Sequence, residues 1–179
     1  REKQGFLAVF PFEYPTGGVG DYRESCLNVR NVRGQNGCEL FFDSYEIQRG
    51  KPALEGLPAS FGSEDEVTTL KIVLKDSVLK LSAELLYSVF EEQDVITRSV
   101  ILKNEGEDSL TVDRVLSAAF DMDDQDFELI TLNGAWGRER HIQRRKLGYG
   151  RQSAASLRGV SSPQEHPFMA LVSPCTDQK

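Results

Sequence analysis

The chain has few of the residues that most self-contained active sites use. Its 179 residues include three cysteines and two histidines. Cys26, Cys38 and Cys175 are far apart, and this spacing predicts reduced thiols, not a disulfide framework or a metal site. His141 and His166 lie in no pattern typical of metal ligands or a catalytic triad, and no glycine-rich phosphate loop follows a strand. We therefore expect no catalytic residue, no metal and no cofactor in this chain.

Long apolar runs are also missing, and the longest are far too short to cross a bilayer. The net charge of −7 argues against nucleic acid as a partner. Apolar residues make up 39% and charged residues 27% of the chain, close to the averages of globular proteins. No signal peptide is visible, and the sparse cysteines favour a cytoplasmic location. We expect one folded domain with no nucleic-acid or membrane partner.

The apolar residues that are present recur mostly with a period of two, which is typical of β-strands. Within residues 79–89, for example, Leu81, Ala83 and Leu85 share one face. No segment predicts a long helix, so about eight to nine strands indicate an all-β antiparallel sandwich. The expected strands are residues 26–32, 39–44, 69–76, 79–89, 95–103, 110–120, 127–132 and 166–173.

Turns and loops are predicted from glycine, proline and acidic residues. Asn36-Gly37 predicts a hairpin between the first two strands, and residues 104–107 predict a turn in which Gly106 is able to take a positive φ. The acidic residues 121–126 lack the glycine and final glutamate of an EF-hand, so a solvated loop is expected there. Residues 134–167 show little alternation and predict one long loop, a length that is uncommon unless it has a function.

The only tryptophan, Trp136, lies between Gly134-Ala135 and Gly137, directly before a basic stretch. One interpretation is a core tryptophan packed between sheets. The flanking glycines and following arginines favour an exposed loop instead, where a flat amphipathic ring suits the face of a sugar. The basic stretch could equally be a solvated loop, with Arg138 and Arg140 paired to Glu139 or to residues 121–126.

Several short motifs, in order along the chain, resemble the N-terminal domain of the bacterial glycoside hydrolase family 36 α-galactosidases. The most specific are the Gly-Ala-Trp-Gly-Arg-Glu-Arg run at 134–140 and the proline loop that follows Gly50. The matching stretches are residues 20–23, 50–59, 94–99, 129–141, 158–162 and 167–171. One departure follows residue 162, where Pro163-Gln-Glu-His166 replaces the family's Ser-Ser-His and Asn-Pro-Phe pattern.

The resemblance implies a galactose-mutarotase-like β-supersandwich, of which residues 1–179 are a truncated fragment. It implies a tetrameric retaining enzyme that hydrolyses terminal α-galactosyl residues of melibiose, raffinose and related oligosaccharides. Its two catalytic aspartates belong to a (β/α)₈ barrel, which needs about 250 residues and alternating helices. The barrel is therefore absent here, and the fragment alone is expected to be inactive.

The resemblance also implies that the domain contacts its own barrel and neighbouring subunits and forms one wall of the sugar pocket. Trp136 and Arg138 are the residues expected to contact substrate. Arg140, Arg144 and Arg145 are expected to support loops or interfaces. Two alternatives are a free-standing carbohydrate-binding β-sandwich module and an interaction domain that uses the basic stretch on an anionic polymer.

Overall fold

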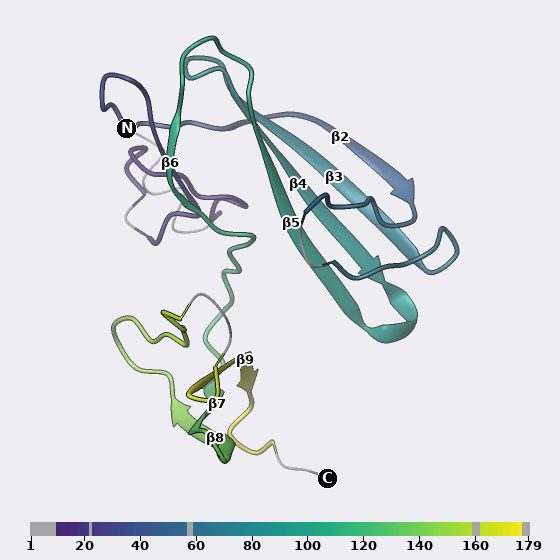
Figure 1. Cartoon of the computed structure of the whole chain (residues 1–179), viewed down its shortest axis with the longest axis vertical. Coiled ribbons are helices and arrows are strands. Elements are labelled where there is room, and N and C mark those ends of the chain that lie inside the picture. The colour runs from purple at the N-terminus through teal and green to yellow at the C-terminus, as the bar shows by residue number, and fades with distance from the viewer. Residues whose placement is uncertain (1–9, 22, 57–58, 159–161, 177–179) are drawn as a thin grey trace. The chain divides into compact units, whose positions relative to one another are not determined.

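A computed structural model describes residues 10–21, 23–56, 59–158 and 162–176, in two compact units, Arg1–Asp121 and Met122–Lys179 (Figure 1). The described residues form strands and one short 3₁₀ helix, with no helix long and apolar enough for a membrane span. The all-β prediction is confirmed. The strands are β1 (Leu27–Arg30), β2 (Phe41–Arg49), β3 (Val67–Asp76), β4 (Leu81–Phe90), β5 (Val95–Asn104), β6 (Thr111–Val115), β7 (Glu128–Ala135), β8 (Arg138–Lys146) and β9 (Glu165–Val172), with the helix at Glu91–Gln93.

The larger unit is built on a four-stranded antiparallel sheet with the order β2-β3-β4-β5 (Figure 1). β3 and β4 pair without a register shift from Val67↔Phe90 to Asp76↔Leu81. The alternation of their apolar residues places Leu81, Ala83 and Leu85 on one face, as the sequence predicts.

The core lies where β1, paired with β6, packs against that face of the sheet. Burial of these side chains removes apolar surface from water, which is the main stabilising contribution in a small sandwich. β4 is covered on both faces, because Ser82, Leu86 and Ser88 on its second face are also buried. The buried core consists of Tyr14, Cys26, Leu27, Val29, Cys38, Leu81, Ala83 and Leu85.

The predicted hairpin at Asn36-Gly37 is wrong. β1 pairs with β6, eighty residues further along the chain, and not with β2. The chain turns earlier, because Asn31 Oδ1 accepts hydrogen bonds from the backbone N–H of Arg33 and of Gln35, both at 3.0 Å. This side chain closes the turn directly after β1, so the Asn-Gly pair falls in the connection to β2.

The turn after β5 forms where predicted. Asn104 Oδ1 accepts a hydrogen bond from Gly106 N at 3.0 Å, which makes an Asx turn. Gly106 does not adopt a positive φ in this turn. The strand that follows is shorter than predicted, and it pairs with β1 instead of folding back on β5.

The smaller unit is a three-stranded antiparallel sheet with the order β8-β7-β9 (Figure 1). The prediction of one long loop over residues 134–167 is wrong, because β8 occupies its first part. Every residue of β8 is exposed, so the strand has no buried face to produce alternation. Of the described residues in this unit, only Leu129 and Thr131 are buried.

Candidate functional site

Trp136 lies at the tip of the β7–β8 hairpin. Ala135 pairs with Arg138, so Trp136 and Gly137 form a two-residue turn, and Gly137 has a positive φ of 76°, which glycine adopts without strain. The indole is 88% exposed within this chain, which contradicts the core interpretation and places the ring where a ligand can reach it.

Gly134 shapes the base of this hairpin. The register shifts between Asn133 and Ala135, which marks a bulge in β7. A Cβ atom at Gly134 would lie 2.1 Å from the carbonyl oxygen of Arg138, so no other residue fits this close approach. The Gly-Ala-Trp-Gly run therefore has a local structural reason, independent of any ligand.

Glu139 stabilises the same turn. Its Oε1 accepts a hydrogen bond from the backbone N–H of Gly137 at 2.7 Å. Neither Arg138 nor Arg140 forms an ion pair with Glu139 or residues 121–126 within the described part of the chain. The acidic stretch has other cationic partners: Arg23 Nη1 lies 3.1 Å from Asp121 and Lys146 Nζ lies 3.9 Å from Asp126. Arg138 is thus exposed beside Trp136, on the strand that leaves the tip.

Arg144 has a structural role. Its Nε donates to the carboxylate of Glu128 on β7, and its Nη atoms donate to three backbone carbonyls after β9. These bonds are 3.1 Å to Ser173, 2.9 Å to Pro174 and 2.8 Å to Thr176. One guanidinium therefore joins β7 to the segment that follows β9.

A cavity of about 270 Å³ lies beside the hairpin and was not expected from the sequence. Its lining combines a carboxylate, a guanidinium, a hydroxyl and an imidazole. The Nδ1 atom of His166 is buried and has no hydrogen-bond partner among the described residues. The lining residues are Glu139, Arg140, Ser162, Pro163 and His166.

Hydrogen bonds fix one wall of this cavity, the turn before β9, to β7. Ser162 and Glu165 exchange backbone hydrogen bonds of 3.3 and 3.2 Å, which form a tight turn before β9. Asn133 Nδ2 donates to Glu165 Oε2 at 2.5 Å. Gly134 N also donates to the carbonyl of Gln164 at 3.2 Å, so the turn is fixed to β7 by both side chain and backbone.

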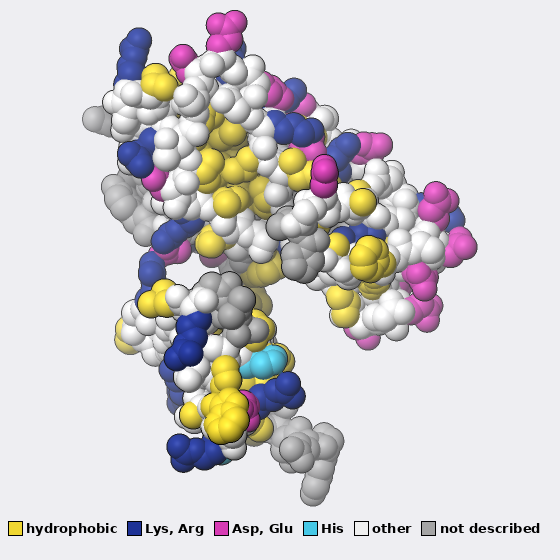
Figure 2. All heavy atoms as spheres, viewed as in Figure 1, with side chains coloured by type: hydrophobic (Ala, Val, Ile, Leu, Met, Phe, Trp, Pro, Cys, Tyr) yellow, Lys and Arg dark blue, Asp and Glu magenta, His cyan; other side chains and the backbone are white. Residues whose placement is uncertain are grey.

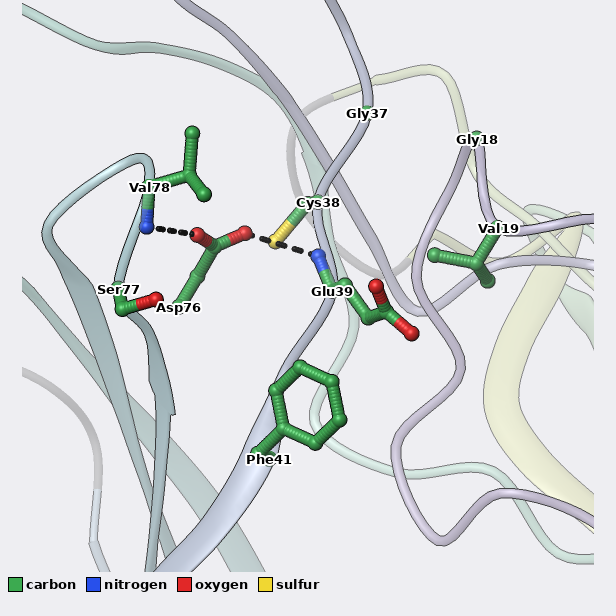
Figure 3. A pocket seen from close by; sticks show the side chains of 9 residues that line it. All are labelled: Gly18, Val19, Gly37, Cys38, Glu39, Phe41, Asp76, Ser77 and Val78. Atoms are coloured by element: carbon green, nitrogen blue, oxygen red, sulfur yellow. Dashed lines mark hydrogen bonds between the residues drawn. The ribbon is translucent and has the colours of Figure 1, made fainter.

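A second cavity, of about 350 Å³, lies in the larger unit around Asp76 (Figure 3). The Asp76 carboxylate accepts hydrogen bonds of 2.8 Å from the backbone N–H groups of Glu39, Val78 and Leu79. Burial, with the adjacent Asp76 carboxylate, raises the pKa of the Cys38 thiol to about 12. Because the carboxylate is fully engaged and the thiol stays protonated, this pair joins the segment before β2 to the β3–β4 turn and offers no nucleophile.

The Asp21-Tyr22-Arg23 motif forms a local ion pair. Arg23 Nη2 lies 2.8 Å from Asp21 Oδ2, and the hydrogen bond from Arg23 lowers the pKa of the Asp21 carboxyl. Asp21 and Arg23 therefore have a local structural role, and Tyr22 lies outside the described residues.

Charge is unevenly distributed over the surface. Figure 2 shows Lys and Arg side chains close to hydrophobic ones on the unit that contains β7–β9. No group of three or more His, Cys, Asp or Glu side chains among the described residues is placed to hold a metal ion.

Comparison with known proteins identifies the family. The model of the glycosyl hydrolase family 36 N-terminal domain matches residues 1–179. The chain belongs to this family. The resemblance found in the sequence is therefore confirmed over its whole length.

The relatives include bacterial and fungal α-galactosidases. Alpha-galactosidase Mel36A of Lactobacillus acidophilus is 44% identical over 169 residues, which are 94% of this chain and 23% of that protein. The probable alpha-galactosidase C of Aspergillus flavus is 41% identical over 174 residues, 97% of this chain and 23% of that protein. The chain thus spans less than a quarter of the length of these relatives.

Solved structures show the same fold. The GH36 α-galactosidase AgaB of Geobacillus stearothermophilus matches 96% of this chain with a TM-score of 0.92 and 42% identity, over 24% of its own chain. A variant of AgaA from the same organism, in complex with raffinose, matches 92% of this chain with a TM-score of 0.89 and 43% identity, over 23% of its chain.

Proposed function

We propose that this chain is the non-catalytic N-terminal domain of a retaining α-galactosidase that removes terminal α-galactosyl residues from melibiose- and raffinose-type oligosaccharides. Two carboxyl groups about 5–5.5 Å apart are required for retention, and they belong to a catalytic barrel outside this sequence. The domain supplies scaffold, contacts with the barrel and with other subunits of a tetramer, and one wall of the sugar pocket. We place the enzyme in the cytoplasm.

One observation carries the proposed role in the pocket: the chain's only tryptophan is 88% exposed at the tip of a short hairpin. Other rings are exposed too, such as Phe61 and Tyr149, and what distinguishes Trp136 is its place on a glycine-containing turn directly before Arg138. Trp136 offers a rigid face that can stack on the C–H face of galactose at little cost in side-chain entropy. Arg138, two residues further, is the polar neighbour that we assign to the sugar hydroxyls.

The test is the kinetics of Trp136→Ala in the full-length enzyme, with Trp136→Phe as the matched control. The alanine variant should lower kcat/KM for raffinose by about 10–100-fold, because it removes the stacking surface at the sugar. The phenylalanine variant retains a flat ring and should lose less. An unchanged kcat/KM in a folded alanine variant would contradict the substrate role.

The alternative of a free-standing carbohydrate-binding module makes a different prediction. Such modules generally present more than one exposed ring, and this chain also exposes rings such as Phe42 and Tyr45 on β2, so exposure alone does not separate the two functions. Galactose titration of the isolated chain separates the two. Saturable binding favours the module, and absence of binding favours a pocket that needs the barrel. Steeply salt-dependent binding to an anionic polymer would support an interaction domain.

A further inference from the structure

We propose that the cavity lined by Glu139, Arg140, Ser162, Pro163 and His166 binds the sugar unit next to the galactosyl residue in the oligosaccharide substrate. This inference rests on the proposed function, and it adds a second contact on the leaving-group side of the bond that is cleaved.

The size of the cavity suits one sugar ring. Its volume is about 270 Å³, close to the lower end of the range for small-molecule sites. A whole trisaccharide would not fit, whereas a single hexose unit of a longer substrate would.

The chemistry of the lining favours a neutral polyol. Glu139 and Arg140 contribute opposite charges, so no net charge attracts an anion. Arg140 offers only donors, Glu139 only acceptors, and the Ser162 hydroxyl can act as either. Sugar hydroxyls, which both donate and accept, match such a mixed set.

His166 provides the most specific evidence for a ligand in this cavity. Buried polar atoms in folded proteins nearly always have a hydrogen-bond partner, and each exception needs an explanation. The buried Nδ1 atom of His166 has none among the described residues, although the side chain lines the cavity. A ligand hydroxyl would satisfy this nitrogen in either tautomer, because a hydroxyl can donate or accept.

The cavity is held in a fixed shape. The tight turn of Ser162 and Glu165 forms one wall and is bonded to β7, whereas the other wall is β8. Arg140 adopts a left-handed conformation with a φ of 60°, which is unfavourable for a residue with a Cβ atom. Local strain of this kind recurs at binding sites, where surrounding contacts hold it in place.

The position relative to Trp136 fits consecutive sugar units. Glu139 and Arg140 follow Trp136 by only three and four residues, on the strand that leaves the two-residue turn, so the cavity lies close to the hairpin tip. Glu139 also contacts the turn itself through Gly137 N. A galactosyl residue on the indole would therefore direct the next unit of the oligosaccharide toward the cavity.

The test compares two substrates in the full-length enzyme. His166→Phe preserves the ring and removes both nitrogens, whereas His166→Asn retains a polar atom close to the position of Nδ1. The phenylalanine variant should lower kcat/KM for raffinose about 5–10-fold, the size expected for one hydrogen bond. It should leave kcat/KM for 4-nitrophenyl α-galactoside, which lacks a second sugar, within about twofold of wild type. The asparagine variant should recover most of the loss.

Ser162→Ala is the second variant, because it deletes one hydroxyl on the other side of the cavity and decides the matter if His166→Phe does not fold. A loss of about threefold for raffinose alone is expected. Equal losses on both substrates, or no loss on raffinose, would overturn the proposal. A wild-type enzyme that hydrolyses neither substrate would instead refute the proposed function.

Discussion

The two units of this chain use the same antiparallel pairing for different purposes. In the larger unit, β1 and β4 bury a common core although β2 is mostly exposed, and every member of the buried core cluster belongs to this unit. In the smaller unit, β8 is exposed along its whole length and carries a tryptophan at one end. The comparison shows that backbone pairing between strands is sufficient to form the β7–β8 hairpin. The buried apolar side chains of the larger unit contribute most of the free energy of folding.

The difference in burial between the two units also indicates which unit is structural and which one contacts a ligand. A segment that buries little contributes little to folding, so its side chains are available to contact a ligand or another domain. The sheet β2–β5 is the platform, and the β7–β8 hairpin is the part that meets the substrate in our proposal.

Thiol reactivity should show the largest contrast between the units. Burial raises the pKa of Cys38 to about 12 and also raises that of Cys26, whereas Cys175 in the smaller unit is exposed. The thiolate is the reactive form, so at pH 8 only about one Cys38 in 10⁴ is reactive. Alkylation with iodoacetamide, followed by mass spectrometry, should modify Cys175 rapidly and leave the other two intact. Equal labelling of the three would contradict the contrast.

The same pKa shift has a consequence for stability. The folded state favours the protonated thiol, so the stabilisation is complete below the ordinary pKa of 9.0 and is lost as the pH rises toward 12. Urea unfolding between pH 8 and pH 11 should therefore show decreasing stability, and a Cys38→Ser variant should show a weaker decrease.

The Leu85→Ala variant, together with a surface control, compares how much core and surface side chains contribute to the free energy of unfolding. Leu85 is completely buried on β4, so the substitution should lower the free energy of unfolding by about 2–5 kcal/mol through lost burial and a cavity. Ile142→Ala is the matched control, because Ile142 on β8 is 66% exposed and should change stability by less than about 0.5 kcal/mol. Chemical denaturation of the purified chain measures both. Similar effects at the two sites would remove the distinction between platform and hairpin.

Asp76→Ala should destabilise the larger unit by about 2–3 kcal/mol. Three backbone N–H groups lose their acceptor, and charged hydrogen bonds of this kind are worth more than neutral ones. Asp76→Asn retains one oxygen and should lose less. The melting temperature of the two variants provides the measurement, and an alanine variant as stable as the asparagine variant would show that the bonds matter little.

Trp136→Ala should have the smallest effect on stability, within about 0.5 kcal/mol, because the ring is exposed. A core tryptophan would instead cost about 3–5 kcal/mol. Thermal unfolding of the same variant that is used for kinetics separates lost function from lost folding.

The sequence predicted the platform because its residues carry a two-residue period. Leu81, Ala83 and Leu85 are buried on one face, as their alternation indicates. β8 was missed because Ile142 is its only apolar residue and neither face is buried. A strand that is exposed on both sides leaves no periodic signal.

The pairing of strands that are distant in the chain could also not be predicted from the sequence. Asn36-Gly37 has the composition of a hairpin turn, yet β1 finds its partner in β6, since tertiary packing overrides a local preference. For the site, the glycines around Trp136 correctly indicated an exposed ring. The cavity at His166 could not be foreseen, because Ser162 and Glu139 are brought together only by pairing across the sheet.

The most direct test of the central claim is a crystal structure of the full-length enzyme with raffinose bound. Our account predicts carbon atoms of the Trp136 ring within about 4 Å of a sugar ring. It also predicts that the hairpin lines the occupied pocket. A bound raffinose with no contact to any residue of the β7–β8 hairpin would contradict it.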